Sequence, residues 1–473
     1  MKNWKGIFTL ALALMLIFTT AACSNSNNAS GNGNGNTAAN TNKDGNGGSE
    51  PAPEPKTVKV AFVKWGEDHI WIKWMNKVKK EFEEKHPGVT VELIPVPGQD
   101  FQTKFSLMMM DEKTAPDVLT EDTFLVNSDV AAGNLSPLDD KLAAWEDWSK
   151  INPAVHEAVK GADGKLYGVP FNTDTRGLYY NTNIFKEAGI PVPWQPKNWN
   201  EILDAAAKIK TARPDVVPFW ANAGKATGEG TTMQTFEMLL YGTDDTLYDY
   251  DQNKWVVESP GIVKSLQFVQ NMFSKGLGPK LSQILTPQAP QILEKDLLRK
   301  EKVGIVLNGN WMPGPFREGG TLAWPEMTKV YQLAAMPTEQ GQGKGFTSMS
   351  GGWALSVPAK AQQKDLAFEF VTTAMNYDNH KFLSLGDASL TPRTDLAEDP
   401  EYKDAPGMVV GRAAEFIQYT NFRPAFAEYP SVSTHIQEMV EVVAAGKMKP
   451  EEAMKQFSKN VVRLVGEDKV IKK

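Results

Sequence analysis

The sequence contains very little cysteine and histidine. Among its 473 residues there is one cysteine, Cys23, so no disulfide framework can form within the chain. The five histidines are scattered between His69 and His435, and they do not cluster with the spacing of metal ligands. The sequence therefore predicts a fold without disulfides, without a metal site and without a cofactor.

An excess of basic residues and a long apolar run are also missing. Lys and Arg number 50 against 57 Asp and Glu, which gives a formal net charge of −7. An acidic chain argues against nucleic acid as a partner and against broad attraction to anionic lipid. The apolar run from Ile7 to Phe18 is shorter than the ~20 residues that a membrane-spanning helix needs.

The common catalytic motifs are absent too. The sequence has no G-x-S-x-G, no H-E-x-x-H and no P-loop. The glycine-rich stretch Gly341–Gly345 does not precede a helix start, which argues against a phosphate cradle. A glycoside hydrolase needs two carboxylates at a defined separation, and the sequence fixes no such pair. A secreted hydrolase therefore stays open only as a secondary alternative.

The N-terminus has the order of a signal peptide. Lys2 and Lys5 precede the apolar run, and small residues follow it up to Cys23. We predict a signal peptide over residues 1–22. Residues 23–55 are rich in Asn, Gly, Ser, Ala and Pro, and this composition predicts a disordered tether. Cleavage near Ala22 without lipidation is the alternative.

The remaining chain is too long for one compact core, so two lobes are expected. Val58–Val63 has the pattern of a strand, apolar residues then recur at helical spacing from Ile70 to Phe82, and Val89–Val96 has the pattern of a second strand. This βαβ order predicts a parallel sheet that binds ligands at the carboxyl ends of its strands.

A stretch from Lys302 to Met375 presents aromatic residues in strand-end loops. Val303–Leu307, Tyr331–Met336 and Trp353–Val357 are predicted strands, and helical spacing follows around Phe368. Two of the connecting loops place a tryptophan beside glycine. Such loops suit a flat ligand that is pressed against an aromatic face.

Several motifs in this body resemble one protein family. They are N-G-N-W at 308–311, M-P at 336–337, G-G-W at 351–353, G-N-L-S-P-L-D at 133–139, and R-P-A-F-A-E-Y-P at 423–430. Together they are similar to the sugar-binding group of the extracellular solute-binding proteins of ABC importers. The resemblance extends over the body from Lys56 onward. Ala21 to Ser24 also resembles a bacterial lipobox, although Thr20 stands where leucine is usual.

The resemblance implies an α/β fold with two lobes, of the type II periplasmic-binding-protein-like class, with a hinge and an interlobe ligand cleft. Lobe one would comprise residues 56–167 and 337–386, and lobe two residues 168–336 and 391–473. The hinge would lie near 168–175 and 335–338.

The same resemblance implies a function. The protein would be a monomeric substrate-binding lipoprotein, lipidated at Cys23 and held at the outer face of the cell membrane. It would capture a carbohydrate, expected to be an oligosaccharide, and deliver it to an ABC permease without making or breaking a bond. A lipoprotein of the same fold that binds a peptide or a polyamine is the main alternative.

A sugar site needs aromatic platforms and planar polar side chains. The predicted platforms and polar contacts are Trp65, Trp220, Trp311, Trp353, Glu67, Asp122, Thr173, Asp174, Asn222 and Arg423, with Asp68 and Arg393 as weaker candidates. Each has a plainer reading: core packing for a loop tryptophan, a turn partner for Asp174, and an ion pair within lobe two for Arg423. Trp71, Trp74 and Trp199 lie on apolar helix faces, where core packing is expected.

Overall fold

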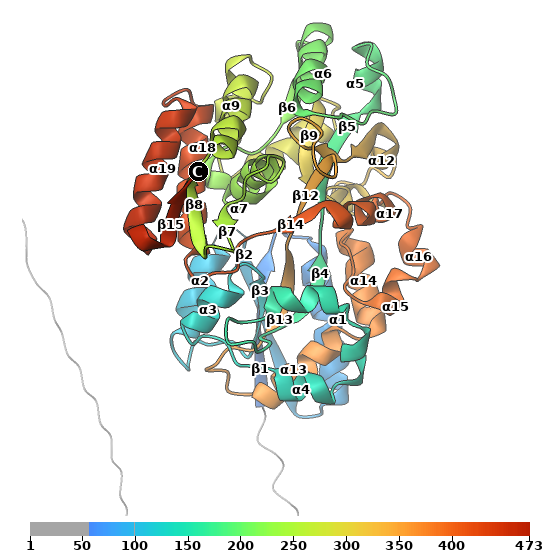
Figure 1. The fold of residues 1–473 in the computed structure, drawn as a ribbon. Coiled ribbons are helices and arrows are strands. Elements are labelled where there is room, and N and C mark those ends of the chain that lie inside the picture. Colours follow the sequence, from blue (N-terminus) through green and yellow to red (C-terminus); the bar gives the residue numbers. More distant parts are fainter. Residues whose placement is uncertain (1–55, 99) are drawn as a thin grey trace, which may run out of the picture. The chain divides into compact units, whose positions relative to one another are not determined.

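The computed structural model describes residues 56–98 and 100–473, which belong to one compact unit, Pro53–Lys473 (Figure 1). The predicted signal peptide, the predicted lipidation site Cys23 and the predicted tether lie outside the described residues. Within the described part of the chain, no helix combines the length and the apolar character needed to cross a membrane.

The first sheet has five strands in the order β2-β1-β3-β13-β4, and it lies in the lower half of Figure 1. Its strands are β1 (Lys56–Lys64), β2 (Val89–Pro97), β3 (Val118–Asp122), β4 (Val169–Thr173) and β13 (Gly352–Ser356). β1 runs parallel to β2 and β3, whereas β13 runs antiparallel to β3 and β4. The predicted βαβ unit is therefore confirmed, and β13 adds an antiparallel strand to it.

Helix α1 (Ile70–Lys85) shows why this sheet forms a core. Its buried residues are Ile70, Trp71, Trp74, Met75, Val78 and Phe82. These are the positions that recur at helical spacing in the sequence, so the predicted apolar face is confirmed. Together with α13 (Lys364–Ala374) and α14 (Tyr377–Asp387), this face closes the first hydrophobic core. We call the first sheet and its helices lobe one.

The second sheet has four strands in the order β10-β5-β9-β6, in the upper half of Figure 1. Its strands are β5 (Arg176–Asn181), β6 (Val217–Trp220), β9 (Val303–Gly309) and β10 (Tyr331–Ala334). All residues of β5 are buried, because helices and loops cover both faces of this sheet. The larger helices packed here are α6 (Trp199–Ala212), α9 (Pro260–Ser274), α18 (Tyr429–Ala444) and α19 (Pro450–Val465). We call this part lobe two.

Smaller elements complete the two lobes. Lobe two contains two π-helical segments, η4 (Thr232–Glu237) and η5 (Ile292–Leu298), and η4 lies between α7 (Glu229–Thr231) and the short helix α8 (Met238–Leu240). Other short elements are α2 (Phe101–Met109), α3 (Val126–Ala131), α4 (Asp139–Ala144), α5 (Thr182–Glu187), α12 (Met327–Val330), α17 (Val410–Ala414), β7 (Tyr248–Asp249), β8 (Lys254–Glu258) and β15 (Val470–Lys472).

The chain passes between the sheets at positions that differ from the predicted lobe boundaries. β4 pairs with β13 in the first sheet, so the chain leaves lobe one after Thr173 and not after residue 167. It returns at Gly351, between β12 (Phe346–Ser350) and β13, and not at residue 337. The difference arises because β12 pairs with β11 (Met336–Pro337) and β14 (Thr420–Phe422), and Met349 of β12 is buried in the core of lobe two.

Candidate ligand-binding site

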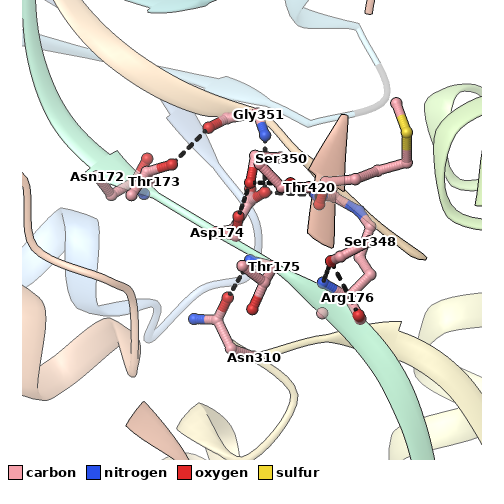
Figure 2. A network of polar contacts seen from close by, with 12 residues as sticks. Asn172, Thr173, Asp174, Thr175, Arg176, Asn310, Ser348, Ser350, Gly351 and Thr420 are labelled. Atoms are coloured by element: carbon pink, nitrogen blue, oxygen red, sulfur yellow. Dashed lines mark hydrogen bonds and ion pairs between the residues drawn. The ribbon is translucent and has the colours of Figure 1, made fainter. Parts of the chain in front are cut away.

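Two chain segments meet where the strands pass between the lobes, and we call residues 172–176 and 348–353 the crossing region (Figure 2). The Thr173 hydroxyl donates to the carbonyl oxygen of Gly351 at 3.1 Å. The Gly351 N–H donates to the carboxylate of Asp174 at 2.8 Å, and the Ser350 hydroxyl donates to the carbonyl oxygen of Asp174 at 2.6 Å. Thr173 and Asp174, both predicted as ligand contacts, thus also hold the two crossing segments together.

Glycine is required at one point of this crossing. Gly352 has φ +152°, and a Cβ atom there would lie 2.4 Å from the carbonyl oxygen of Asn172. Both the backbone conformation and the close approach exclude a larger residue. The two segments can therefore pass side by side, and Asn172 accepts a hydrogen bond from the Trp353 N–H at 2.8 Å.

Trp311 lies at the lobe-two side of the crossing region. Its indole lies so close to Gly309 that a Cβ atom on that residue would come within 1.9 Å of the ring. The guanidinium carbon of Arg176 lies 4.9 Å from the ring centroid, in a cation–π arrangement. Arg176 in turn pairs with the Asp174 carboxylate and donates to the Met349 carbonyl oxygen at 2.9 Å. One network thus joins Trp311 to Asp174.

Arg423 joins carboxylates of both lobes. Its Nη2 lies 2.9 Å from Asp122, at the end of β3 in lobe one, and its Nη1 lies 3.2 Å from Glu229 of lobe two. The guanidinium also lies over the ring of Phe124, 4.5 Å from its centroid. Burial raises the pKa of Asp122 to about 6, against the lowering effect of Arg423. Asp122 and Arg423 were both predicted site residues, and the structure brings them together as an ion pair.

An aromatic cluster lies on the lobe-one side. The ring centroid of Trp353 lies 5.7 Å from that of Trp65, 5.2 Å from that of Trp71 and 5.2 Å from that of Phe101. Trp65 is 45% exposed and Trp353 is half-buried, whereas Trp71 and Phe101 are buried beneath them. The two predicted platforms of lobe one therefore share one edge-to-face cluster with accessible indole surface.

Asn222 also lies near the Arg423 cluster. A Cβ atom on Gly230 would come 2.8 Å from the Asn222 amide nitrogen, and Gly230 follows directly after Glu229. The structure therefore groups eight of the ten predicted residues around the crossing region: Trp65, Asp122, Thr173, Asp174, Asn222, Trp311, Trp353 and Arg423.

The other two predicted residues lie elsewhere. Trp220 is 1% exposed and belongs to the hydrophobic core of lobe two, because both faces of that sheet are covered. Glu67 is largely exposed and forms an ion pair with Lys64 at 2.7 Å. The weaker candidate Arg393 is buried between Asp147 and Asp395, at 2.8 and 2.6 Å, and therefore has a structural role. Asp68 is exposed on the surface.

Sequence reasoning missed several residues that contact this group. Arg176 interrupts an apolar strand two positions after Asp174, and Glu229 follows a glycine-rich loop, so both had a local signal. Asp387 had no such signal in the sequence. In the structure its carboxylate lies 3.4 Å from the Asn172 amide nitrogen and 3.8 Å from the His69 ring nitrogen. Burial raises the pKa of Asp387 and lowers that of His69.

Two surface hollows, of about 450 and 390 Å³, lie on lobe two outside this group of residues. One is lined by Lys264 and Lys473 and the other by Leu333 and Arg412, and no residue of the crossing region lines either. No set of three or more His, Cys, Asp or Glu side chains within residues 56–98 and 100–473 is arranged to hold a metal ion. The chemistry available around the crossing region is hydrogen bonding, ion pairing and aromatic stacking.

Glu237 lies at the end of η4 and is fully buried, beside the cluster of Arg423 and Glu229. Burial, followed by the charge of Glu229, raises the pKa of Glu237 to about 8. One carboxyl oxygen lies 3.1 Å from the Tyr429 hydroxyl, which lies at the same distance from Glu229. The other oxygen has no hydrogen-bond partner among the described residues. The raised pKa favours the protonated form of Glu237 at neutral pH.

This protonation predicts a pH dependence of stability. The folded pKa of Glu237 lies above the ordinary value of 4.5, so its favourable contribution is complete below pH 4.5 and is lost as the pH rises through about 8. Glu237→Gln, which stays neutral, should therefore reduce the fall in unfolding free energy between about pH 5 and about pH 8.5. Urea denaturation at both pH values measures this. The exposed variant Glu467→Gln is the control, and equal falls in wild type and Glu237→Gln would contradict the prediction.

The family described as bacterial extracellular solute-binding protein matches residues 71–381, more than half of the chain. A crystal structure of an ABC transporter solute-binding protein from Thermotoga lettingae, bound with α-D-tagatose, superposes with a TM-score of 0.75. The two are 26% identical, and the match covers 87% of this chain and 100% of that one.

Two relatives are similar in sequence. The galactooligosaccharide-binding protein of Bacillus subtilis (strain 168) is 24% identical over 378 residues, which cover 79% of this chain and 82% of the relative. A protein of Brucella abortus (strain 2308), named only as a binding protein, is 26% identical over 264 residues, 56% of this chain. This second match spans 59% of the relative's own length.

Proposed function

Because the chain belongs to the family of bacterial extracellular solute-binding proteins, we propose that it captures a carbohydrate and delivers it to the permease of an ABC importer. The observation that best supports this proposal is the grouping of Trp65, Trp311 and Trp353 beside the polar side chains of the crossing region. Indole rings cover the C–H faces of a sugar, and amides and carboxylates bind its hydroxyls.

The ligand would bind between the lobes. Residues of both lobes would contact it, and closure would bend the chain at 174–176 and at Gly351. The eight grouped residues form the proposed site. An oligosaccharide is the proposed ligand, since the aromatic surfaces lie on both lobes and could contact more than one ring.

A ligand screen tests this function. We expect the melting temperature of the chain from Ser24 onward to rise with galactobiose, arabinotriose, tagatose or mannitol, because a ligand that binds only the folded state stabilises it. Calorimetry then gives the affinity. A rise with spermidine or a peptide, and with none of the saccharides, would support the alternative binding class. The absence of a rise with any saccharide would contradict the proposed function.

The bound ligand would leave unaltered. The family and the solved neighbours are binding proteins. A reducing-sugar assay on the same saccharides is expected to show no new ends over a day. Sugar release above a heat-treated control would instead support a hydrolase.

The family is extracellular, which places this chain outside the cytoplasm. We further propose that a lipid on Cys23 anchors it as a monomer at the outer face of the membrane, where the permease lies. Cys23→Ala should move the protein from the membrane fraction to the culture medium, because the variant has no thiol to acylate. Immunoblots of both fractions measure this, with Ser24→Ala as the control. A Cys23→Ala protein that stays in the membrane fraction would show that another feature anchors it.

A further inference from the structure

We infer that this site takes an uncharged sugar or polyol and excludes sugar phosphates and uronic acids, because its two arginines are already paired with carboxylates. This inference rests on the proposed function and narrows its substrate class. It is carried by two arginines and three carboxylates, which are Arg176, Arg423, Asp122, Asp174 and Glu229.

Arg423 offers little to an anionic ligand. Two of its nitrogens are bound to two carboxylates, at 2.9 and 3.2 Å, and Phe124 lies against the face of its guanidinium. The residue is only 9% exposed. A phosphate or carboxylate of a ligand that took either of these positions on Arg423 would displace Asp122 or Glu229 and leave that mostly buried carboxylate without its partner.

The guanidinium of Arg176 is likewise already bonded to other groups of the protein. It pairs with Asp174, donates to the carbonyl oxygen of Met349 and covers one part of the Trp311 ring. Its Nε atom is buried without a partner among the described residues, and the whole residue is only 5% exposed. The cation beside the proposed stacking ring therefore supports the ring and is not free for a ligand.

The net charge of these five groups also disfavours an anionic ligand. Three carboxylates face two guanidinium groups, so this set carries a net charge of 2 − 3 = −1. A ligand anion would meet this excess at short range in a poorly hydrated environment, where like charges repel strongly. Nearby, Arg317 donates to the carbonyl oxygen of Gly386 at 3.0 Å and faces the charge of Asp387, so counting both groups leaves the net charge at 3 − 4 = −1.

Each of the three carboxylates already has an arginine partner. Asp174 accepts bonds from Arg176 and from the Gly351 N–H, and Asp122 accepts from Arg423. Glu229 accepts from Arg423 and from Ser433. The groups left over suit hydroxyls: the amides of Asn172 and Asn222, which both donate and accept, and the indole surfaces of Trp65 and Trp353.

Matched ligand pairs test this inference on the chain from Ser24 onward. Calorimetry would compare galactobiose with digalacturonate, and mannitol with mannitol 1-phosphate. We expect each charged member to bind at least about 100-fold more weakly than its neutral partner. Equal or tighter binding of a charged member would overturn the inference while leaving carbohydrate binding in place. No binding of any saccharide, neutral or charged, would overturn the proposed function itself.

A variant tests whether the paired charges cause the exclusion of anionic ligands. Glu229→Gln removes one negative charge and one of the two ion pairs of Arg423. It should therefore narrow the affinity gap between galactobiose and digalacturonate, the ratio of their dissociation constants, by about tenfold. Glu438→Gln, which removes a half-exposed carboxylate paired with Lys225, is the matched control and should leave the gap unchanged. An unchanged gap in Glu229→Gln would overturn the role assigned to the paired charges. The wild-type comparison keeps the inference falsifiable even if this variant folds poorly.

Discussion

Replacing Arg423 by methionine is expected to lower the free energy of unfolding by about 3–5 kcal/mol at neutral pH. The substitution keeps most of the side-chain volume over Phe124 but leaves the carboxylates of Asp122 and Glu229 buried without a cation. Breaking a buried ion pair from one side costs more than the pair itself contributes, because the remaining charges lose their solvation. Chemical denaturation of the variant and of wild type measures the loss.

The loss should shrink in acid. Asp122 already has a pKa of about 6 with its partner present, and protonation removes the uncompensated charge. Arg213→Gln is a matched control, since Arg213 pairs with Glu187 and Asp215 at the surface, where removal should cost about 1 kcal/mol or less. A loss below about 1 kcal/mol in Arg423→Met would show that both carboxylates reach water without the arginine.

Trp311→Ala is expected to weaken carbohydrate binding by about 1–3 kcal/mol, the usual value of an aromatic stacking surface. The ring is fixed by its close approach to Gly309 and by Arg176, so little side-chain entropy would be lost on binding. Calorimetry with whichever saccharide raises the melting temperature most gives the change.

A second tryptophan separates stacking from general destabilisation. Trp148 is half-buried in lobe one and stacks on His156 at 4.0 Å, outside the group around the crossing region. Trp148→Ala should affect stability and leave the affinity unchanged, while Trp311→Phe should recover part of the lost affinity. An unchanged affinity in Trp311→Ala would remove this residue from the site.

Much of the fold could be predicted because its signals are local. The apolar face of α1, the strand before N-G-N-W and the turn at Gly351–Gly352 each depend on residues that are neighbours in sequence. The lobe boundaries could be predicted less well. The pairing of β12 with β14 joins residues about 70 positions apart, and hydrophobic periodicity does not indicate which sheet such a strand joins.

The candidate site shows the same division. Asp122 and Arg423 were each recognisable as polar residues in strand-end or loop positions, but their ion pair spans 301 positions and no local pattern reports it. Trp220 illustrates the opposite error. A tryptophan at a strand end has the same sequence pattern in a ligand platform and in a core, and only the cover on both faces of the second sheet distinguishes them.

Phe124 has one further consequence. It follows a strand of lobe one, yet its ring is 4% exposed and packs 5.8 Å from Tyr429 within the core of lobe two. Any movement that separates the lobes at this point must hydrate a phenyl ring, and hydrating apolar surface raises the heat capacity. The free-energy difference between the open and closed forms should therefore depend nonlinearly on temperature even when no sugar is bound. The temperature dependence of uptake would then be set in part by Phe124, a residue that need not contact the sugar.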